Sequence, residues 1–243
     1  MNKLSLLCLL NLLFLFFGCR STYYMVEVDS IKDKNLKEKG NINYILLPSN
    51  DGVDINDLKF KEYSDYVRIA LSKQVFIESS PDSAEIAIFF SYGIGDPKEH
   101  TYSYTYPIIG KQGGDKTNIN ARIYNSDGSS SRIYGTTYSK PKYGVTGYVS
   151  GTSTYTTYFR YATLEAIDLE KFRKIGESIT VWQTNLTSTG SGNDLRVIMP
   201  VMIAASIPYL GKDSGKMINV KLTEKDYDVL QIKGMKINPD VTK

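Results

Sequence analysis

The feature that most limits the fold of this chain is a nearly uninterrupted apolar segment toward its C-terminal end, Leu195–Leu210. The segment contains a single charge, Arg196, and two prolines, Pro200 and Pro208. It is shorter than the roughly 20 residues that a bilayer-spanning helix needs, and proline interrupts helical hydrogen bonding. We therefore expect a buried helix with a kink.

A loop containing two glycines comes directly before this segment, in the stretch "NLTSTGSGNDLRVIMP" (Asn185–Pro200). The order strand, glycines, helix is typical of nucleotide-binding loops, but the lysine of a P-loop and the third glycine of a dinucleotide site are missing. Asp194 would also place a negative charge where a phosphate would lie. Ser191, Asn193 or Asp194 can instead cap the first free N–H groups of the helix. We predict a capped helix start and no nucleotide site.

Hydrophobic periodicity predicts the other elements. Asp57–Gln74 has the pattern of an amphipathic helix, and Thr223–Asp226 resembles a capping box for a short final helix. The expected strands are Tyr23–Ile31, Ile42–Pro48, Val75–Ser79, Ala84–Ile94, Phe159–Leu169, Ser178–Ser188 and Met217–Leu222. The predicted fold class is α+β: a mainly antiparallel sheet with two main helices packed on it, and a Tyr/Gly/Ser-rich β-hairpin extension.

The extension is an insertion at about 98–155 that is rich in tyrosine, glycine, serine and threonine. Its first part, "HTYSYTYPI", alternates residue types so that Tyr102, Tyr104 and Tyr106 share one face of an extended strand. We expect a loop around 126–150. The tyrosines can stabilise a hairpin through cross-strand pairs, or they can form a contact surface for an envelope protein or a glycan. Both interpretations remain open.

The first residues, "MNKLSLLCLLNLLFLFFGCR", have the composition of an export signal. One cation, Lys3, precedes the apolar run Leu4–Phe17, whose length fits the central region of a signal peptide better than a membrane-spanning helix. We predict that residues 1–18 are a signal peptide.

This run ends in glycine and Cys19, which resembles the lipobox of bacterial lipoproteins, although Phe16 and Phe17 depart from its usual leucine and small residue. The resemblance implies cleavage before Cys19 and attachment of acyl chains such as palmitate, which would hold the protein to a membrane without spanning it. Residues 19–22 would form the lipidated end and a short tether. Arg20, in place of aspartate, implies delivery to the outer membrane. The alternative is an ordinary signal peptide followed by an incidental cysteine.

Cysteine and histidine usage excludes several kinds of chemistry. Cys8 would leave with the signal peptide and Cys19 would be acylated, so no disulfide or thiol nucleophile is expected. His100 is the single histidine, which excludes a multi-histidine metal site. The formal net charge is only +3, and the basic residues form no stripe along the sequence. Nucleic acid is therefore not an expected partner.

Nucleophilic and carboxylate chemistry are also weakly supported. Ser139–Lys142 matches S-x-x-K, but it lies in a turn-like segment without the companion motifs of that family. Asp51, Asp54 and Asp57 could bind a hard cation, although their spacing equally suits a turn and a helix start. We predict a protein that is not an enzyme, without catalytic residues, metal or cofactor.

Ordered blocks along most of the chain resemble a group of uncharacterised bacterial envelope lipoproteins, related to the domain of unknown function 4136 family. The blocks are "YYMVEVDSI", "IAIFFSYGIGDP", "TTYFRY", "VWQTNLTSTGSGNDLRVIMPVMIAASIPYLG" and "INVKL". The resemblance implies an α/β-type lipoprotein domain with no catalytic residues, in which the glycine loop and the following helix are a structural signature.

Together these patterns predict a single domain at 23–235, followed by a tail at 236–243. The leading functional hypothesis is a lipid-anchored, non-enzymatic binding or assembly module at the bacterial outer membrane. A second hypothesis is a glycan or peptidoglycan contact protein that uses Tyr102, Tyr104 and Tyr106. A hydrolase ranks third, and the sequence does not indicate an oligomeric state.

Overall fold

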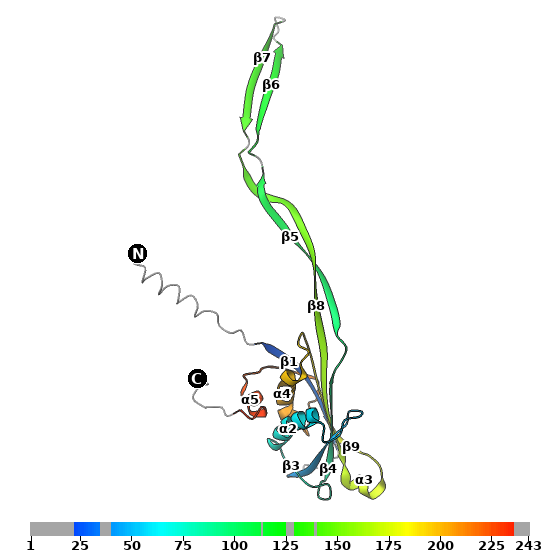
Figure 1. Cartoon of the computed structure of the whole chain (residues 1–243). Coiled ribbons are helices and arrows are strands. Elements are labelled where there is room, and N and C mark those ends of the chain that lie inside the picture. The colour runs from blue at the N-terminus through cyan, green and yellow to red at the C-terminus, as the bar shows by residue number, and fades with distance from the viewer. Residues whose placement is uncertain (1–21, 35–39, 113, 125–128, 139, 236–243) are drawn as a thin grey trace, which may run out of the picture. The chain divides into compact units, whose positions relative to one another are not determined.

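The computed structural model describes residues 22–34, 40–112, 114–124, 129–138 and 140–235. The predicted signal peptide, Cys19 and the predicted tail lie outside these residues. The chain forms two compact units: one comprises the chain up to Lys98 and from Thr157 onward, and the other is Glu99–Thr156. Figure 1 traces their elements. No helix within the described ranges is long and apolar enough to cross a membrane.

The first unit is built on a sheet with the strand order β10-β1-β9-β8-β4-β2-β3. The sheet's eighth strand, β5 (Lys98–Gln112), pairs with β8. The strands on the main path are β1 (Tyr23–Lys32), β2 (Ile42–Pro48), β3 (Phe76–Glu78), β4 (Ile86–Ile94), β8 (Lys142–Asp168), β9 (Thr180–Gly190) and β10 (Ile218–Thr223). Each strand predicted for this unit is present, and β4 has the central position expected from its apolar composition.

The sheet is mixed, which corrects the predicted mainly antiparallel arrangement. The strands β10, β1, β9, β8 and β4 pair antiparallel in succession. Strand β2, in contrast, is parallel to both of its neighbours, β3 and β4. The reason is the helix between β2 and β3, α2 (Leu58–Ser72), because a helical crossover returns the chain in its original direction.

Four α-helices occur in the described part of the chain, so the expectation of two main helices was also wrong. The two anticipated long helices are α2 and α4 (Leu195–Ser206), and a 3₁₀ turn at Ile207–Tyr209 follows α4. The others are α3 (Leu169–Ile175), where we expected a turn, and α5 (Tyr227–Ile232), which is the expected short final helix. Both are too short to produce a clear helical period. The N-cap residue of α5 is Asp226 rather than Thr223.

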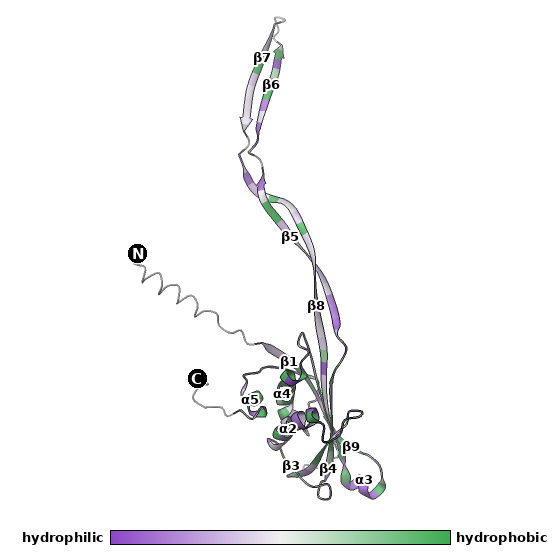
Figure 2. Cartoon of the chain, in the orientation of Figure 1, coloured by the Kyte–Doolittle hydropathy of each residue, from purple (hydrophilic) through white to green (hydrophobic). Residues whose placement is uncertain are grey.

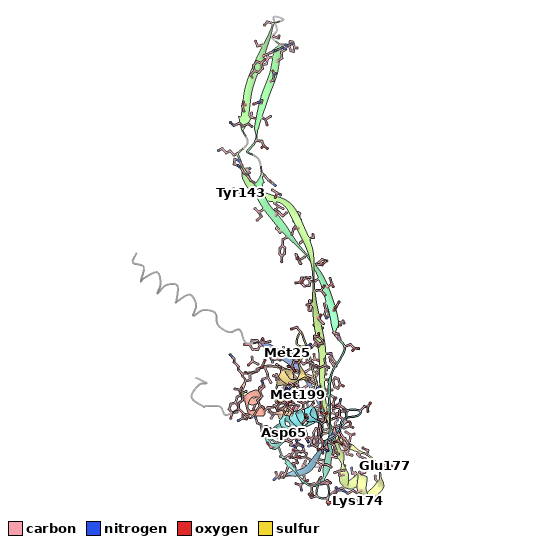
Figure 3. The ribbon with its side chains drawn as sticks, in the orientation of Figure 1. Met25, Asp65, Tyr143, Lys174, Glu177 and Met199 are labelled. Atoms are coloured by element: carbon pink, nitrogen blue, oxygen red, sulfur yellow. The ribbon has the colours of Figure 1, made fainter. Side chains whose placement is uncertain are left out.

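The core of this unit lies where α2 and α4 meet each other and the sheet. Every residue of α4 from Ile198 to Ser206 is buried, which confirms the predicted buried helix. Figure 2 shows hydrophobic residues along this helix, and Figure 3 labels Met199, whose side chain is fully buried. Complete burial of such an apolar helix stabilises the fold by removing its side chains from water.

The second unit consists of β-hairpin structure. Strand β5 pairs with the first part of β8, and β6 (Lys116–Tyr124) pairs antiparallel with β7 (Ser130–Tyr138) in a separate two-stranded sheet. This unit occupies the part of the chain for which we predicted an insertion. The prediction of a loop around 126–150 was wrong for most of that range, because β7 and the start of β8 lie there.

Candidate functional site

Tyr102, Tyr104 and Tyr106 lie on one face of β5. Their ring centroids are 6.4 Å apart between Tyr102 and Tyr104 and 5.1 Å apart between Tyr104 and Tyr106. Tyr155 of β8 joins them, 6.2 Å from Tyr102 and stacked on His100 at 4.9 Å. We call these five residues the tyrosine face.

The tyrosines differ in exposure. Tyr102 and Tyr106 are 52% and 62% exposed, whereas Tyr104 is only half-exposed because its ring covers Gly151. A Cβ built at Gly151 would lie 2.6 Å from the Tyr104 hydroxyl. Tyr104 therefore has a structural part in the hairpin, while the outer two rings are available for contact.

The opposite face of the same hairpin is lined by hydroxyl groups. Thr101 and Thr154 approach with Oγ1 atoms 3.3 Å apart, and Thr105 Oγ1 lies 2.9 Å from Ser150 Oγ. These cross-strand hydroxyl pairs satisfy each other and interact favourably with water. Over Thr101–Thr105 and the opposing Ser150–Thr154, the hairpin is therefore amphipathic, with one aromatic face and one polar face.

No residue of the second unit is buried, within the portion that the structure describes. Large hydrophobic side chains exposed there include Ile108, Ile109, Ile119, Ile123, Tyr124, Ile133, Tyr134, Tyr143 and Tyr148. Figure 3 labels Tyr143, which is 80% exposed. An isolated two-stranded hairpin is at best marginally stable in water. This unit therefore has much more apolar surface to bury than its own strands can cover.

The glycine loop of the first unit is a capped helix start, as predicted. Asp194 is the N-cap residue of α4, and its Oδ1 accepts a hydrogen bond of 2.9 Å from the backbone N–H of Arg196. Ser191 and Asn193, the alternatives considered, do not cap the helix. A pocket lies beside this loop, and Asp194 is not among the residues that line it, so its carboxylate does not occupy the pocket.

This pocket has a volume of about 330 Å³ and is formed by three neighbouring strands of the sheet. Thr22–Met25, at the start of β1, line one side, and Ser188–Gly192, at the end of β9, line another. Arg160 of β8 completes the lining. Met25, labelled in Figure 3, is 48% exposed.

Arg160 lies on the core-facing side of β8. It shares the alternation of Ala162, Leu164 and Ala166, which are fully buried, and is itself only 2% exposed. Its Nε donates a hydrogen bond of 3.4 Å to the carbonyl of Ser188, the residue opposite it on β9. Neither Nη atom has a partner, and no carboxylate pairs with the guanidinium, among residues that the structure describes.

Burial lowers the pKa of Arg160 from its ordinary value, and the neighbouring Tyr24 raises it in part. A guanidinium nevertheless stays protonated in proteins. Burying an ion without a countercharge costs several kcal/mol. Arg160 is therefore a permanent positive charge. No opposite charge in the described chain offsets the free-energy cost of burying it.

Tyr24 and Glu224 form the nearest charged network. The Tyr24 hydroxyl donates a hydrogen bond of 2.8 Å to Glu224 Oε1, and burial followed by this bond raises the pKa of Tyr24 to about 12. Lys233 Nζ lies 3.4 Å from Glu224 Oε2. Glu224 is thus bound by Tyr24 and Lys233, and it forms no ion pair with Arg160.

Sequence reasoning did not identify Arg160, although a signal was present. In "FRYATLEAIDL" the arginine stands at the same parity as the residues that face the core. A cation at such a position is unusual because it must be paired or reach a pocket. Its proximity to Ser188 and the glycine loop depends on the pairing of β8 with β9, which the sequence does not reveal.

Asp54 and Asp57, two of the three acidic residues proposed for a cation, have structural roles, and Asp51 lies in the exposed turn before them. Asp57 is the N-cap residue of α2 and accepts hydrogen bonds from the N–H groups of Lys59 and Phe60. Asp54 Oδ1 accepts a bond of 2.8 Å from the N–H of Asn56. Within the described residues, no three histidine, cysteine, aspartate or glutamate side chains cluster so that they could hold a metal ion. These carboxylates stabilise a turn and a helix start.

Comparison with known proteins gives no family for this chain: no protein-family model and no curated protein matches it. Among solved structures, a PDZ domain protein from Parabacteroides distasonis ATCC 8503 is similar with a TM-score of 0.36 and 12% identity, over 84% of this chain and 40% of that protein. The lysenin pore matches with a TM-score of 0.10 and 9% identity, over 83% and 49% of the two chains. This chain thus spans less than half the length of either protein, and the TM-scores are too low to inform on its fold or function.

Proposed function

We propose that this protein is a lipid-anchored, non-enzymatic binding or assembly module of a bacterial envelope. The observation that carries the proposal is the second unit, an amphipathic hairpin with an exposed aromatic face and no buried residue in its described portion. Covering one such face removes apolar area from water, which favours association at about 25 cal/mol per Å² before the costs of ordering.

The composition of the hairpin suits a protein partner. Tyrosine supplies large contact area at low entropic cost, and serine, threonine and glycine supply adaptable neighbours, as in antibody paratopes. The tyrosine face contains no carboxylate, lysine or arginine, so recognition would rest on apolar contact and hydroxyl hydrogen bonds. A surface protein of the envelope is the occupant that the proposed location favours.

The anchor rests on the N-terminal sequence. Acylation of Cys19 would supply the two or three chains needed for stable attachment. Metabolic labelling with a palmitate analogue should label the wild-type chain and leave Cys19→Ser unlabelled and released from the membrane. Labelling of Cys19→Ser at the wild-type level would exclude the anchor.

Partner binding is tested by affinity capture from crosslinked envelopes. Tyr102, Tyr104 and Tyr106 changed together to Ser should lose the captured protein. The matched control changes Tyr124, Tyr134 and Tyr143 to Ser, which removes the same number of tyrosines from the same unit. Equal capture by both triple variants and by wild type would exclude the tyrosine face as the contact surface.

A glycan is the second candidate, because exposed aromatic rings stack on sugar rings. The rings of Tyr102 and Tyr104 are inclined by 52° to each other, and those of Tyr104 and Tyr106 by 46°. Single rings would therefore have to act as separate stacking sites. Wild type should then co-sediment with purified sacculi, and the Tyr102, Tyr104 and Tyr106 variant should not. This result, together with capture of no protein, would favour glycan binding over a protein partner.

A further inference from the structure

The pocket at Arg160 provides several hydrogen-bond donors in one place. The guanidinium is buried and lacks a countercharge, and its two Nη atoms are without partners in the described chain. The pocket-lining Ser191 and Gly192 have backbone N–H groups for which the described residues supply no acceptor. A planar guanidinium and free backbone N–H groups are the donors that bind phosphate in many proteins.

The loop lets the guanidinium approach closely. A Cβ at Gly190 would lie 2.5 Å from Nη2 of Arg160, and one at Gly192 would lie 3.9 Å from Nη1. The glycine at 190 therefore leaves the space that the Arg160 side chain occupies. The Ser188 hydroxyl is not free for a ligand, since it donates a bond of 2.8 Å to the carbonyl of Met25.

The source of an anion follows from the position of the pocket along the chain. Thr22, which lines it, is three residues after Cys19, a separation that a fully extended chain can span over at most about 11 Å. Tyr23 and Met25 beside it are 61% and 48% exposed, and Lys221 Nζ lies 4.1 Å above the Tyr23 ring. Exposed tyrosine with lysine is typical of the membrane–water interface.

We infer that this pocket binds the phosphate group of a membrane lipid headgroup, held by Arg160 and the N–H groups of the glycine loop. The choice of a lipid rests on the proposed acylation of Cys19, which would keep the pocket at headgroup depth. The phosphate chemistry of the pocket does not depend on that anchor or on the tyrosine face. A lipid phosphate would supply the countercharge that Arg160 lacks.

The test uses the mature chain, Cys19–Lys243, carrying Cys19→Ser so that no acyl group contributes. Binding is measured to vesicles of phosphatidylcholine that contain phosphatidylglycerol. Arg160→Met should weaken binding about tenfold or more, because hydrogen bonds to a charged group are lost. Lys174→Met is the charge-matched control: Lys174 lies on α3, is labelled in Figure 3 and should bind as wild type does.

Two further measurements separate binding from folding. Arg160→Met should melt no lower than wild type in the absence of vesicles, because an uncompensated buried charge has been removed. Arg160→Lys keeps the charge but loses the paired donors, and its affinity should fall between those of the other two chains.

Equal vesicle binding by wild type and Arg160→Met would overturn the inference, and so would equal weakening by Lys174→Met. Inorganic phosphate and glycerol phosphate are titrated separately by calorimetry. If they bind wild type while the vesicles do not, the occupant is a soluble phosphate and the lipid assignment is wrong. Since the assayed chain has no acyl group, failure here leaves the labelling of Cys19 and the capture experiment unaffected.

Discussion

The guanidinium of Arg160 occupies the space beside Gly190 where any other residue would place its Cβ. The distance from that Cβ position to Nη2 would be 2.5 Å, which is shorter than real side chains tolerate. Gly190 does not have a positive φ, so the absence of a side chain at this position leaves room for Arg160 and does not serve an unusual backbone conformation.

Gly190→Ala should therefore destabilise the protein by overpacking. The new methyl group must displace the guanidinium end of the Arg160 side chain, which is flexible and borders the pocket, so the cost in the free energy of unfolding should lie at the low end of the overpacking range, about 1 kcal/mol. Gly192→Ala is the control, since its Cβ would approach Nη1 no closer than 3.9 Å. Urea unfolding compares the two variants, and equal stability would contradict the close approach.

The capping of α4 should be lost in Asp194→Ala. The carboxylate accepts the N–H of Arg196, and removal of such a cap costs about 1 kcal/mol. Asn193→Ala, one residue earlier, should have a much smaller effect because Asn193 does not cap the helix. Thermal melts of both variants give the comparison.

Ser30 joins β1 to the segment after α4. It is 1% exposed, and its hydroxyl lies 2.7 Å from Thr184 Oγ1, 3.0 Å from the carbonyl of Tyr209 and 2.8 Å from that of Lys212. The Ser30 hydroxyl can donate to one of these oxygens, and Ser30→Ala leaves that oxygen without its donor, at a cost of about 1–3 kcal/mol in the free energy of unfolding.

The control for this change is Ser206→Ala. Ser206 is also buried, but its hydroxyl donates only to Ile203 within the same helix. In urea titrations, Ser206→Ala should lower the free energy of unfolding by less than Ser30→Ala does. A larger effect for Ser206→Ala would refute the role assigned to Ser30.

Stability should fall in alkali because of buried tyrosines. Tyr63 is 2% exposed, and burial, with Glu62 as the next cause, raises its pKa from 10.0 to about 12. A raised folded-state pKa contributes stability that is full below pH 10 and is lost as the pH rises toward 12. By pH 11 this contribution should have fallen by roughly 1 kcal/mol.

Tyr63→Phe removes the ionisable hydroxyl and with it this pH dependence. Between pH 8 and pH 11 the free energy of unfolding of the variant should therefore rise by roughly 1 kcal/mol relative to that of wild type. Tyr44→Phe should behave in the same direction, because burial also raises the pKa of Tyr44 to about 12. A difference between variant and wild type that stays constant across this pH range would rule out the effect.

Local patterns were sufficient to predict most elements of the first unit. β-branched and aromatic composition located β1, a segment apolar on both faces located β4, and the apolar run with Asp194 before it located α4 and its cap. Pairing direction was not accessible, because β2 becomes parallel to its neighbours only through the path of α2. The short helix α3 was missed because two turns give too little periodicity.

The candidate sites divide in the same way. The shared face of Tyr102, Tyr104 and Tyr106 follows from period two, which is a local property. The pocket requires Arg160 of β8, Tyr24 of β1 and the glycines at the end of β9 to meet, and only the strand order brings them together. Contacts between distant segments are set by tertiary structure, so residue spacing could not indicate this pocket.

The lack of buried residues in the described part of Glu99–Thr156 changes which mutations matter there. In the first unit most sequence change is limited by packing, so folding alone restricts what can vary. In the hairpin unit polar replacements remove no buried side chain, and the close contact of Tyr104 with Gly151 is an exception in which packing matters. Apart from such contacts, mutational tolerance measured across that unit should map its binding surface, because exposed positions that resist replacement do so on account of what they touch outside the chain.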